Sequence, residues 1–143
     1  MRVALWPACS ALLECFDHAL QIAKALGDKF RQARVHELNA DVYGNLGDFE
    51  NSMRSSDEAL QLYQATGDKL NEAKMLGGIG SIYNRLGEPE KAREYLERVL
   101  RLSPILEDKY TEAITLESIG NSYHLEGSSV SCNRIIARSD GGD

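Results

Sequence analysis

The chain has 143 residues, of which 43% are hydrophobic and 27% are charged, with only three prolines. This length and composition are typical of one soluble helical domain with a core of its own. The formal net charge of −6 excludes a nucleic-acid-binding role in our interpretation, because phosphate binding needs clustered Lys and Arg, and here these are interleaved with Asp and Glu.

The first residues, MRVALWPACSALLECF, have part of the layout of a signal peptide, since Arg2 precedes an apolar run. However, Pro7 interrupts the run, and acidic residues follow from Glu14 onward without a small-residue cleavage site. No run approaches the roughly 20 apolar residues of a membrane span, so we expect no membrane partner. We therefore predict a cytoplasmic location, an irregular N-terminus over residues 1–9, and a first helix over 10–26.

A fixed offset of 40 residues relates successive parts of the chain. Gly27-Asp28-Lys29 recurs as Gly67-Asp68-Lys69, and recurs again with one change as Glu107-Asp108-Lys109. The same shift relates four further sets, which are Leu20, Leu60 and Leu100; Ala33, Ala73 and Ala113; Tyr43, Tyr83 and Tyr123; and Gly47, Gly87 and Gly127. Several sets of identical residues that recur at the same offset predict a series of similar structural repeats.

Each repeat is predicted to consist of two helices separated by a glycine turn. In the middle repeat, apolar residues at helical spacing form two faces of a helix over 69–86. Gly87 and Pro89 then favour a turn into a second helix over 89–102, which Ser103-Pro104 is expected to close. The same pattern predicts helices over 29–46, 49–66 and 109–125, and repeats near 10–26, 29–66, 69–104 and 109–127.

The 40-residue pattern fails after Gly127. Ser139 stands at the position of Ala59 and Val99, and the final residues are rich in Ser, Asp and Gly, as disordered termini are. We therefore expect residues 128–143 to be a poorly ordered tail. Because repeats of this kind must stack on neighbours, the array is expected to be truncated at both ends, with an apolar strip at each. This favours end-to-end self-association, or dependence on further repeats.

The sequence contains no recognisable catalytic or metal-binding pattern. Cys9, Cys15 and Cys132 form no CxxC pair, and the three histidines lie far apart along the chain. The glycine cluster at residues 77–80 lacks the preceding strand of a dinucleotide site, and no nucleophile–base pair, Walker loop or zincin motif is present. We therefore expect a protein that is not an enzyme and has no cofactor or metal.

The middle repeat resembles the tetratricopeptide repeat. The residues that carry the resemblance are Leu76, Ile79, Gly80, Tyr83, Gly87, Ala92, Leu96, Val99 and Pro104. It extends over roughly residues 10–127, and its longer period is similar to the variant found in kinesin light chains and cell-polarity adaptors. The resemblance implies an all-α fold, namely an α-solenoid of antiparallel helix pairs that forms a right-handed superhelix of about three repeats.

The resemblance also implies which residues hold paired helices together. Gly80, Gly120 and Ala40 would occupy the position where two helices approach most closely, and a larger side chain there would overpack. Gly77 and Gly78 would instead face a concave groove, or be tolerated without a role. The predicted helix-packing set is Ala40, Gly80, Gly120, Tyr43, Tyr83 and Tyr123.

Because members of the family are overwhelmingly protein-binding scaffolds, the resemblance implies an adaptor that holds a peptide or partner helix in its groove. The groove residues that it implies are Glu37, Asp41, Asn45, Lys74, Gly77, Ser81, Asn84, Arg85, Glu117, Asn121 and His124. Glu37, Asp41 and Glu117 stand where chaperone-binding members place cations, so we expect a neutral or basic ligand. Two alternatives stay open: a regulatory or sensor arm of a larger enzyme or ATPase, and a truncated isoform with little independent function.

Overall fold

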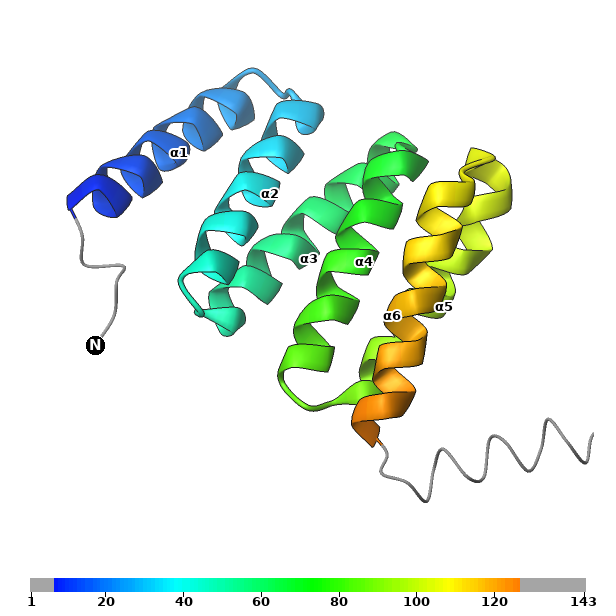
Figure 1. The fold of residues 1–143 in the computed structure, drawn as a ribbon. Coiled ribbons are helices and arrows are strands. Elements are labelled where there is room, and N and C mark those ends of the chain that lie inside the picture. The colour runs from blue at the N-terminus through cyan, green and yellow to red at the C-terminus, as the bar shows by residue number, and fades with distance from the viewer. Residues whose placement is uncertain (1–6, 127–143) are drawn as a thin grey trace, which may run out of the picture. The chain divides into compact units, whose positions relative to one another are not determined.

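The structure is a computed structural model that describes residues 7–126 (Figure 1). Within that range it contains six α-helices and no strand. The helices are α1 (Pro7–Ala25), α2 (Lys29–Asn45), α3 (Phe49–Thr66), α4 (Lys69–Arg85), α5 (Pro89–Leu106) and α6 (Lys109–Glu126). The predicted all-α class is therefore confirmed. The tail predicted over residues 128–143 lies outside the described residues.

Two helix ends differ from the prediction by more than one residue, and proline explains both. α1 begins at Pro7 rather than after residue 9, because a proline fits the first position of a helix, where its missing N–H would have no partner. α5 continues through Pro104 to Leu106. Pro104 cannot donate to the carbonyl of Leu100, but the Ser103 hydroxyl donates a hydrogen bond of 3.0 Å to that same oxygen. The helix therefore continues past the proline.

The turns between helices use aspartate caps and left-handed residues. The Asp28 carboxylate accepts the backbone N–H of Arg31 at 3.0 Å, which satisfies one of the free donors at the start of α2. Gly67 closes α3 with a φ of 75°, a conformation that glycine adopts without strain. Glu107 stands at the matching position after α5 and has a φ of 53°, so a side chain occupies a backbone conformation that favours glycine.

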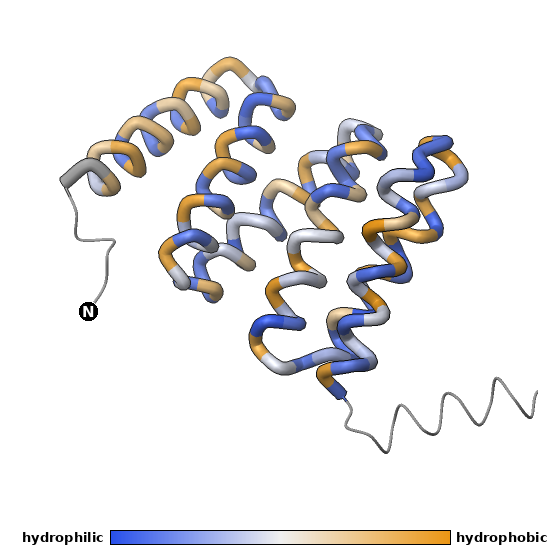
Figure 2. Tube along the Cα trace, viewed as in Figure 1, coloured by the Kyte–Doolittle hydropathy of each residue, from blue (hydrophilic) through white to orange (hydrophobic). Residues whose placement is uncertain are grey.

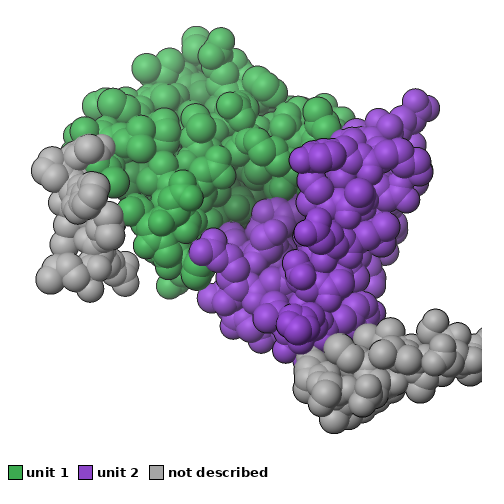
Figure 3. All heavy atoms as spheres, in the orientation of Figure 1, with its two compact units in different colours: residues 1–75 green, residues 76–143 purple. Residues whose placement is uncertain are grey.

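The chain divides into two compact units, an N-terminal unit of residues 1–75 and a C-terminal unit of residues 76–143, and the boundary falls within α4 (Figure 3). In the N-terminal unit, α1 packs on α2, and α2 packs on α3. In the C-terminal unit, α5 packs on α6. Hydrophobic and hydrophilic residues alternate along each helix (Figure 2). The buried side chains include Ala33, Ala59 and Tyr63 in the first unit and Leu76, Ile79, Leu96 and Val99 in the second.

Small residues lie where paired helices meet. A Cβ atom added at Gly80 would stand 2.8 Å from Cγ of Leu96 in α5, closer than real Cβ contacts allow. Ala40 is buried, and its carbonyl accepts a 2.8 Å hydrogen bond from the Ser52 hydroxyl of α3. Gly120 differs, because an added Cβ meets no atom within 4 Å. The close helix approach predicted at Gly120 is therefore absent within residues 7–126, where no helix follows α6.

Gly80→Ala is expected to destabilise the protein by about 1–3 kcal/mol, because the new methyl group overlaps the Leu96 side chain. Gly77→Ala is the matched control, since an added Cβ at Gly77 meets nothing and alanine favours a helix by up to about 1 kcal/mol. Thermal unfolding followed by circular dichroism measures both. Equal shifts in melting temperature for the two variants would contradict the packing described at Gly80.

Glu107→Gly is expected to stabilise the protein by about 0.5–1 kcal/mol, because glycine relieves the left-handed backbone at the end of α5. Gly67→Ala should have the opposite effect, with a loss of about 1 kcal/mol at the matching position after α3. Urea unfolding of the three proteins gives the comparison. A Glu107→Gly variant that is less stable than the parent would show that the Glu107 backbone carries no strain.

Candidate functional site

Glu37, a predicted groove residue, lies in the interior of the N-terminal unit. Its side chain projects from α2 and is only 1% exposed. The Tyr63 hydroxyl of α3 donates a 2.7 Å hydrogen bond to one carboxylate oxygen. Arg34 reaches the same oxygen at 2.8 Å, and the Lys74 ammonium of α4 binds the other oxygen. A buried carboxylate thus joins three helices through three donors.

The donors keep Glu37 ionised in spite of its burial. Burial alone would raise the pKa of Glu37, but hydrogen bonds from Lys74, Tyr63 and Arg34 outweigh it and hold the pKa below the usual value. Burial, together with the hydrogen bond to Glu37, raises the pKa of Tyr63. The expectation that Glu37 presents a free negative charge to a ligand is therefore wrong, because two cations compensate that charge inside the protein.

Other predicted groove residues do gather at one place, in the C-terminal unit. A cavity of about 480 Å³ lies between the end of α4 and the second half of α6. Its lining consists of Ser81, Asn84 and Arg85 from α4 and Ser118, Asn121, His124 and Leu125 from α6. Five of these, all but Ser118 and Leu125, belong to the groove set predicted from the sequence. The lining combines amide, hydroxyl, guanidinium and imidazole groups and contains no carboxylate.

Asn84 fixes the distance between the two helices that border this cavity. Its amide nitrogen donates to the Ser118 carbonyl at 3.3 Å, and the Ser122 hydroxyl donates to its amide oxygen at 2.7 Å. Ser122 is completely buried and Asn84 is half-buried, so this bond is partly shielded from water. Sequence reasoning missed Ser118 and Ser122. One signal was available, because Ser122 stands where the preceding repeats have the apolar residues Ile82 and Val42.

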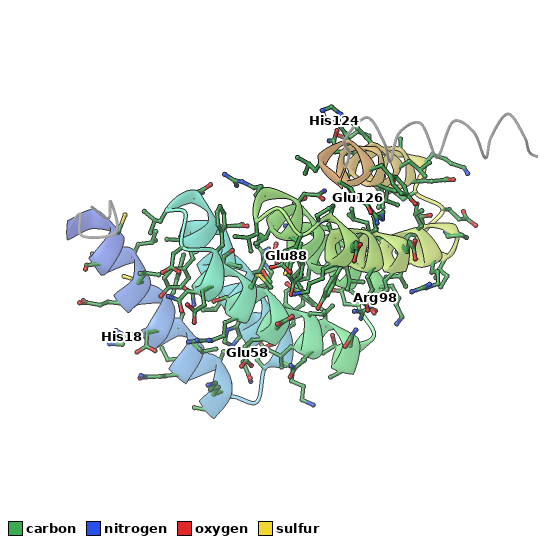
Figure 4. The ribbon with its side chains drawn as sticks, turned by 90° about the horizontal axis from the view of Figure 1, so that it is seen from below. His18, Glu58, Glu88, Arg98, His124 and Glu126 are labelled. Atoms are coloured by element: carbon green, nitrogen blue, oxygen red, sulfur yellow. The ribbon has the colours of Figure 1, made fainter. Side chains whose placement is uncertain are left out.

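A second contact joins α5 to the end of α6. The Arg93 guanidinium of α5 forms a 2.5 Å ion pair with Glu126 and lies 4.3 Å from the centre of the Tyr123 ring. Figure 4 shows Glu126 on the side of α6 nearest to α5, with His124 on another side of the same helix end. The ion pair and the cation–π contact thus hold the α6 end that carries the cavity residues Asn121 and His124.

The remaining predicted groove residues do not line this cavity. Asp41, Asn45 and Glu117 are exposed. Lys74 is also exposed along its side chain, but its ammonium group is bound to Glu37. Gly77 has open space around it.

The stacked rings of Tyr83 and Tyr95, whose centres are 5.6 Å apart, pack α4 on α5.

No group of three or more His, Cys, Asp or Glu side chains within residues 7–126 lies close enough to hold a metal ion. No helix in the same range has the length and apolar character needed to cross a membrane.

Glu37→Gln is expected to lower the free energy of unfolding at pH 7 by about 1–3 kcal/mol. The loss stays in this range because water around the half-exposed Lys74 and Arg34 side chains weakens their ion pairs with Glu37. The folded-state pKa of Glu37 is lowered, so its stabilisation is complete above the unfolded-state pKa of about 4.3 and is lost as the pH falls through the folded value. The difference in the free energy of unfolding between parent and variant should therefore become smaller at acidic pH.

Glu117→Gln is the matched control for this prediction, because Glu117 stands 80 residues, or two repeats, after Glu37 at the same repeat position but is exposed. It should change stability by less than about 0.5 kcal/mol. Chemical unfolding at a series of pH values checks both variants. A pH-independent difference between Glu37→Gln and the parent would show that the Glu37 charge does not stabilise the fold.

Comparison with known protein families matches the middle part of the chain. Residues 31–105 match the model of a family described as tetratricopeptide repeat. The match covers more than half of the chain and includes all of α3 and α4 and nearly all of α2 and α5. A comparison with curated proteins gave no significant match. With its helix pairs, glycine turns and small residues at the helix contacts, the chain belongs to the tetratricopeptide-repeat family.

Proposed function

We propose that this protein is a non-enzymatic interaction scaffold that acts as an adaptor, and that the cavity between α4 and α6 holds a segment of a partner polypeptide. Tetratricopeptide repeats generally mediate protein–protein interaction, which supports the first part. The second part is carried by one observation: five predicted groove residues line a single cavity. They come from α4 and α6, which are the first helices of two consecutive repeats.

The size and chemistry of the cavity suit a short stretch of polypeptide. Its volume of about 480 Å³ falls within the range of about 300–1,000 Å³ found for ligand pockets. Ser81 of α4 and Asn121 of α6 both line the cavity as exposed polar groups, able to donate to and accept from a peptide backbone. Leu125 adds an apolar side chain to the lining.

The proposed segment is polar and uncharged where it enters the cavity. The expectation of a neutral or basic ligand depended on three acidic residues, of which Glu37 is buried and paired with cations. The cavity lining itself has no carboxylate that would select a basic ligand. Six of the seven lining residues carry hydrogen-bonding groups, so an uncharged segment rich in backbone and side-chain amides fits it best.

Cellular location is part of the same proposal. Cys9 and Cys15 in α1 are free thiols, and Cys15 is exposed. Exposed free thiols persist in reducing compartments, where disulfides are rare. This supports a cytoplasmic adaptor.

Asn121→Trp tests the proposed site, because an indole ring on this exposed position would fill the cavity without disturbing a buried contact. Peptides are first selected from a random library against the full chain, and their affinities are then measured by fluorescence anisotropy. We expect Asn121→Trp to weaken binding about tenfold or more, equivalent to about 1.4 kcal/mol. Gln61→Trp, at an exposed position of α3, is the control and should leave the affinity unchanged. Equal affinities for the two variants would overturn the assignment of the cavity.

A further inference from the structure

One face of α6 carries the residues that α4 uses to pack on α5, but no described residue covers it. In α4 this face includes Leu76 and Gly80, and Leu76 is only 1% exposed. The residues 40 positions later are Leu116 and Gly120. Leu116 is 52% exposed, and a Cβ added at Gly120 meets nothing within 4 Å. Together with Ala113, which is also exposed, these residues define the α6 face; Tyr123 lies outside it, because its ring contacts Arg93 of α5.

α1 carries the complementary kind of face, with apolar residues at the positions that α5 uses to pack on α4. Counted by the same offset, Leu12, Phe16 and Ala19 stand at the positions of Ala92, Leu96 and Val99 in α5. Those three α5 residues are buried. In α1 the matching residues, which define the α1 face, are less protected, since Leu12 is 39% exposed and Ala19 is also exposed. α1 thus has the character of a second helix without a first helix, within residues 7–126.

By repeat position, the two faces correspond to the surfaces through which α5 and α4 meet. Phe16 stands at the position of Leu96, whose side chain approaches Gly80, and Gly120 leaves matching space for a large residue. The α1 face and the α6 face contain no charged residue, so their contact would bury none. Apolar surface of both helices would leave water, which is the main driving force of protein association.

We propose that the α1 face of one copy of this chain packs on the α6 face of a second copy, as α5 packs on α4 within one chain. This goes beyond the proposed peptide-binding function, because it uses neither the cavity nor its lining residues. The contact is heterologous: the two copies contribute different surfaces, so each copy keeps one free face and the contact can repeat head to tail.

Sedimentation velocity of the full chain, from micromolar to millimolar concentration, tests the proposal. The parent should associate as its concentration rises. Gly120→Leu and Leu12→Lys should each weaken the association about tenfold or more, because one fills the space on the α6 face and the other places a charge in the α1 face. Two controls should associate like the parent: Gly78→Leu, at an exposed helical glycine outside the α6 face, and Ser10→Lys, at an exposed position of α1.

Mixing the two variants distinguishes a heterologous contact from a symmetric one. The Leu12→Lys chain keeps an intact α6 face, and the Gly120→Leu chain keeps an intact α1 face. The mixture should therefore form a dimer that neither variant forms alone, and this dimer should not grow further. A mixture that stays monomeric, while the parent associates, would overturn the head-to-tail arrangement.

The melting temperature of the Gly120→Leu variant shows whether another segment of the same chain covers the α6 face. If the parent is monomeric at all concentrations and Gly120→Leu lowers the melting temperature, another segment of the same chain covers the α6 face. If the parent is monomeric and the melting temperature is not lowered, the α6 face has no occupant. Either result would refute the proposal. Association of the parent, with a Gly120→Leu melting temperature at least equal to that of the parent at low concentration, supports it.

Discussion

A helix with two apolar faces needs a neighbour on each face, and the rest of this structure depends on that constraint. In α4, Leu76 and Ile79 are both buried, and Gly80 lets the Leu96 side chain of α5 approach the backbone closely. Three glycines within four residues would weaken an isolated helix. Here packing supplies the stability that local propensity lacks, which is the usual source of helix stability in proteins.

Polar residues at packing positions give the repeats their individual character. Glu37 is buried in the N-terminal unit, yet it is satisfied because Arg34, Tyr63 and Lys74 all reach its carboxylate. In the C-terminal unit, Ser122 replaces an apolar residue of the preceding repeats and joins Asn84 across two helices. Such networks hold elements in one arrangement only when every member is paired. The cavity between α4 and α6 therefore has a border fixed by side-chain hydrogen bonds.

Periodicity predicts most of the fold but only part of the site. The bounds of α3, residues 49–66, agree with the prediction because Asp48 and Gly67 mark both ends. α5 extends past its predicted end because the Ser103 hydroxyl replaces the donor that Pro104 lacks. The prediction treated proline as the end of the helix and did not include this hydrogen bond. The burial of Glu37 was not foreseen, since Tyr63 and Lys74 lie 26 and 37 residues away in sequence. By contrast, the resemblance to the repeat family implied a shared surface for Asn121 and His124, and both residues line the cavity.

The most direct test of the account is to map ligand contacts by nuclear magnetic resonance. Backbone amide signals of the ¹⁵N-labelled full chain are followed while a library-selected peptide is added. If the cavity binds polypeptide, the perturbed signals should cluster at the end of α4 and the second half of α6, including Ser81, Ser118 and Asn121. The signals of α2 and α3 should remain unchanged. Perturbations centred on α2 and α3, with the cavity residues unaffected, would contradict the central claim that this cavity is the binding site.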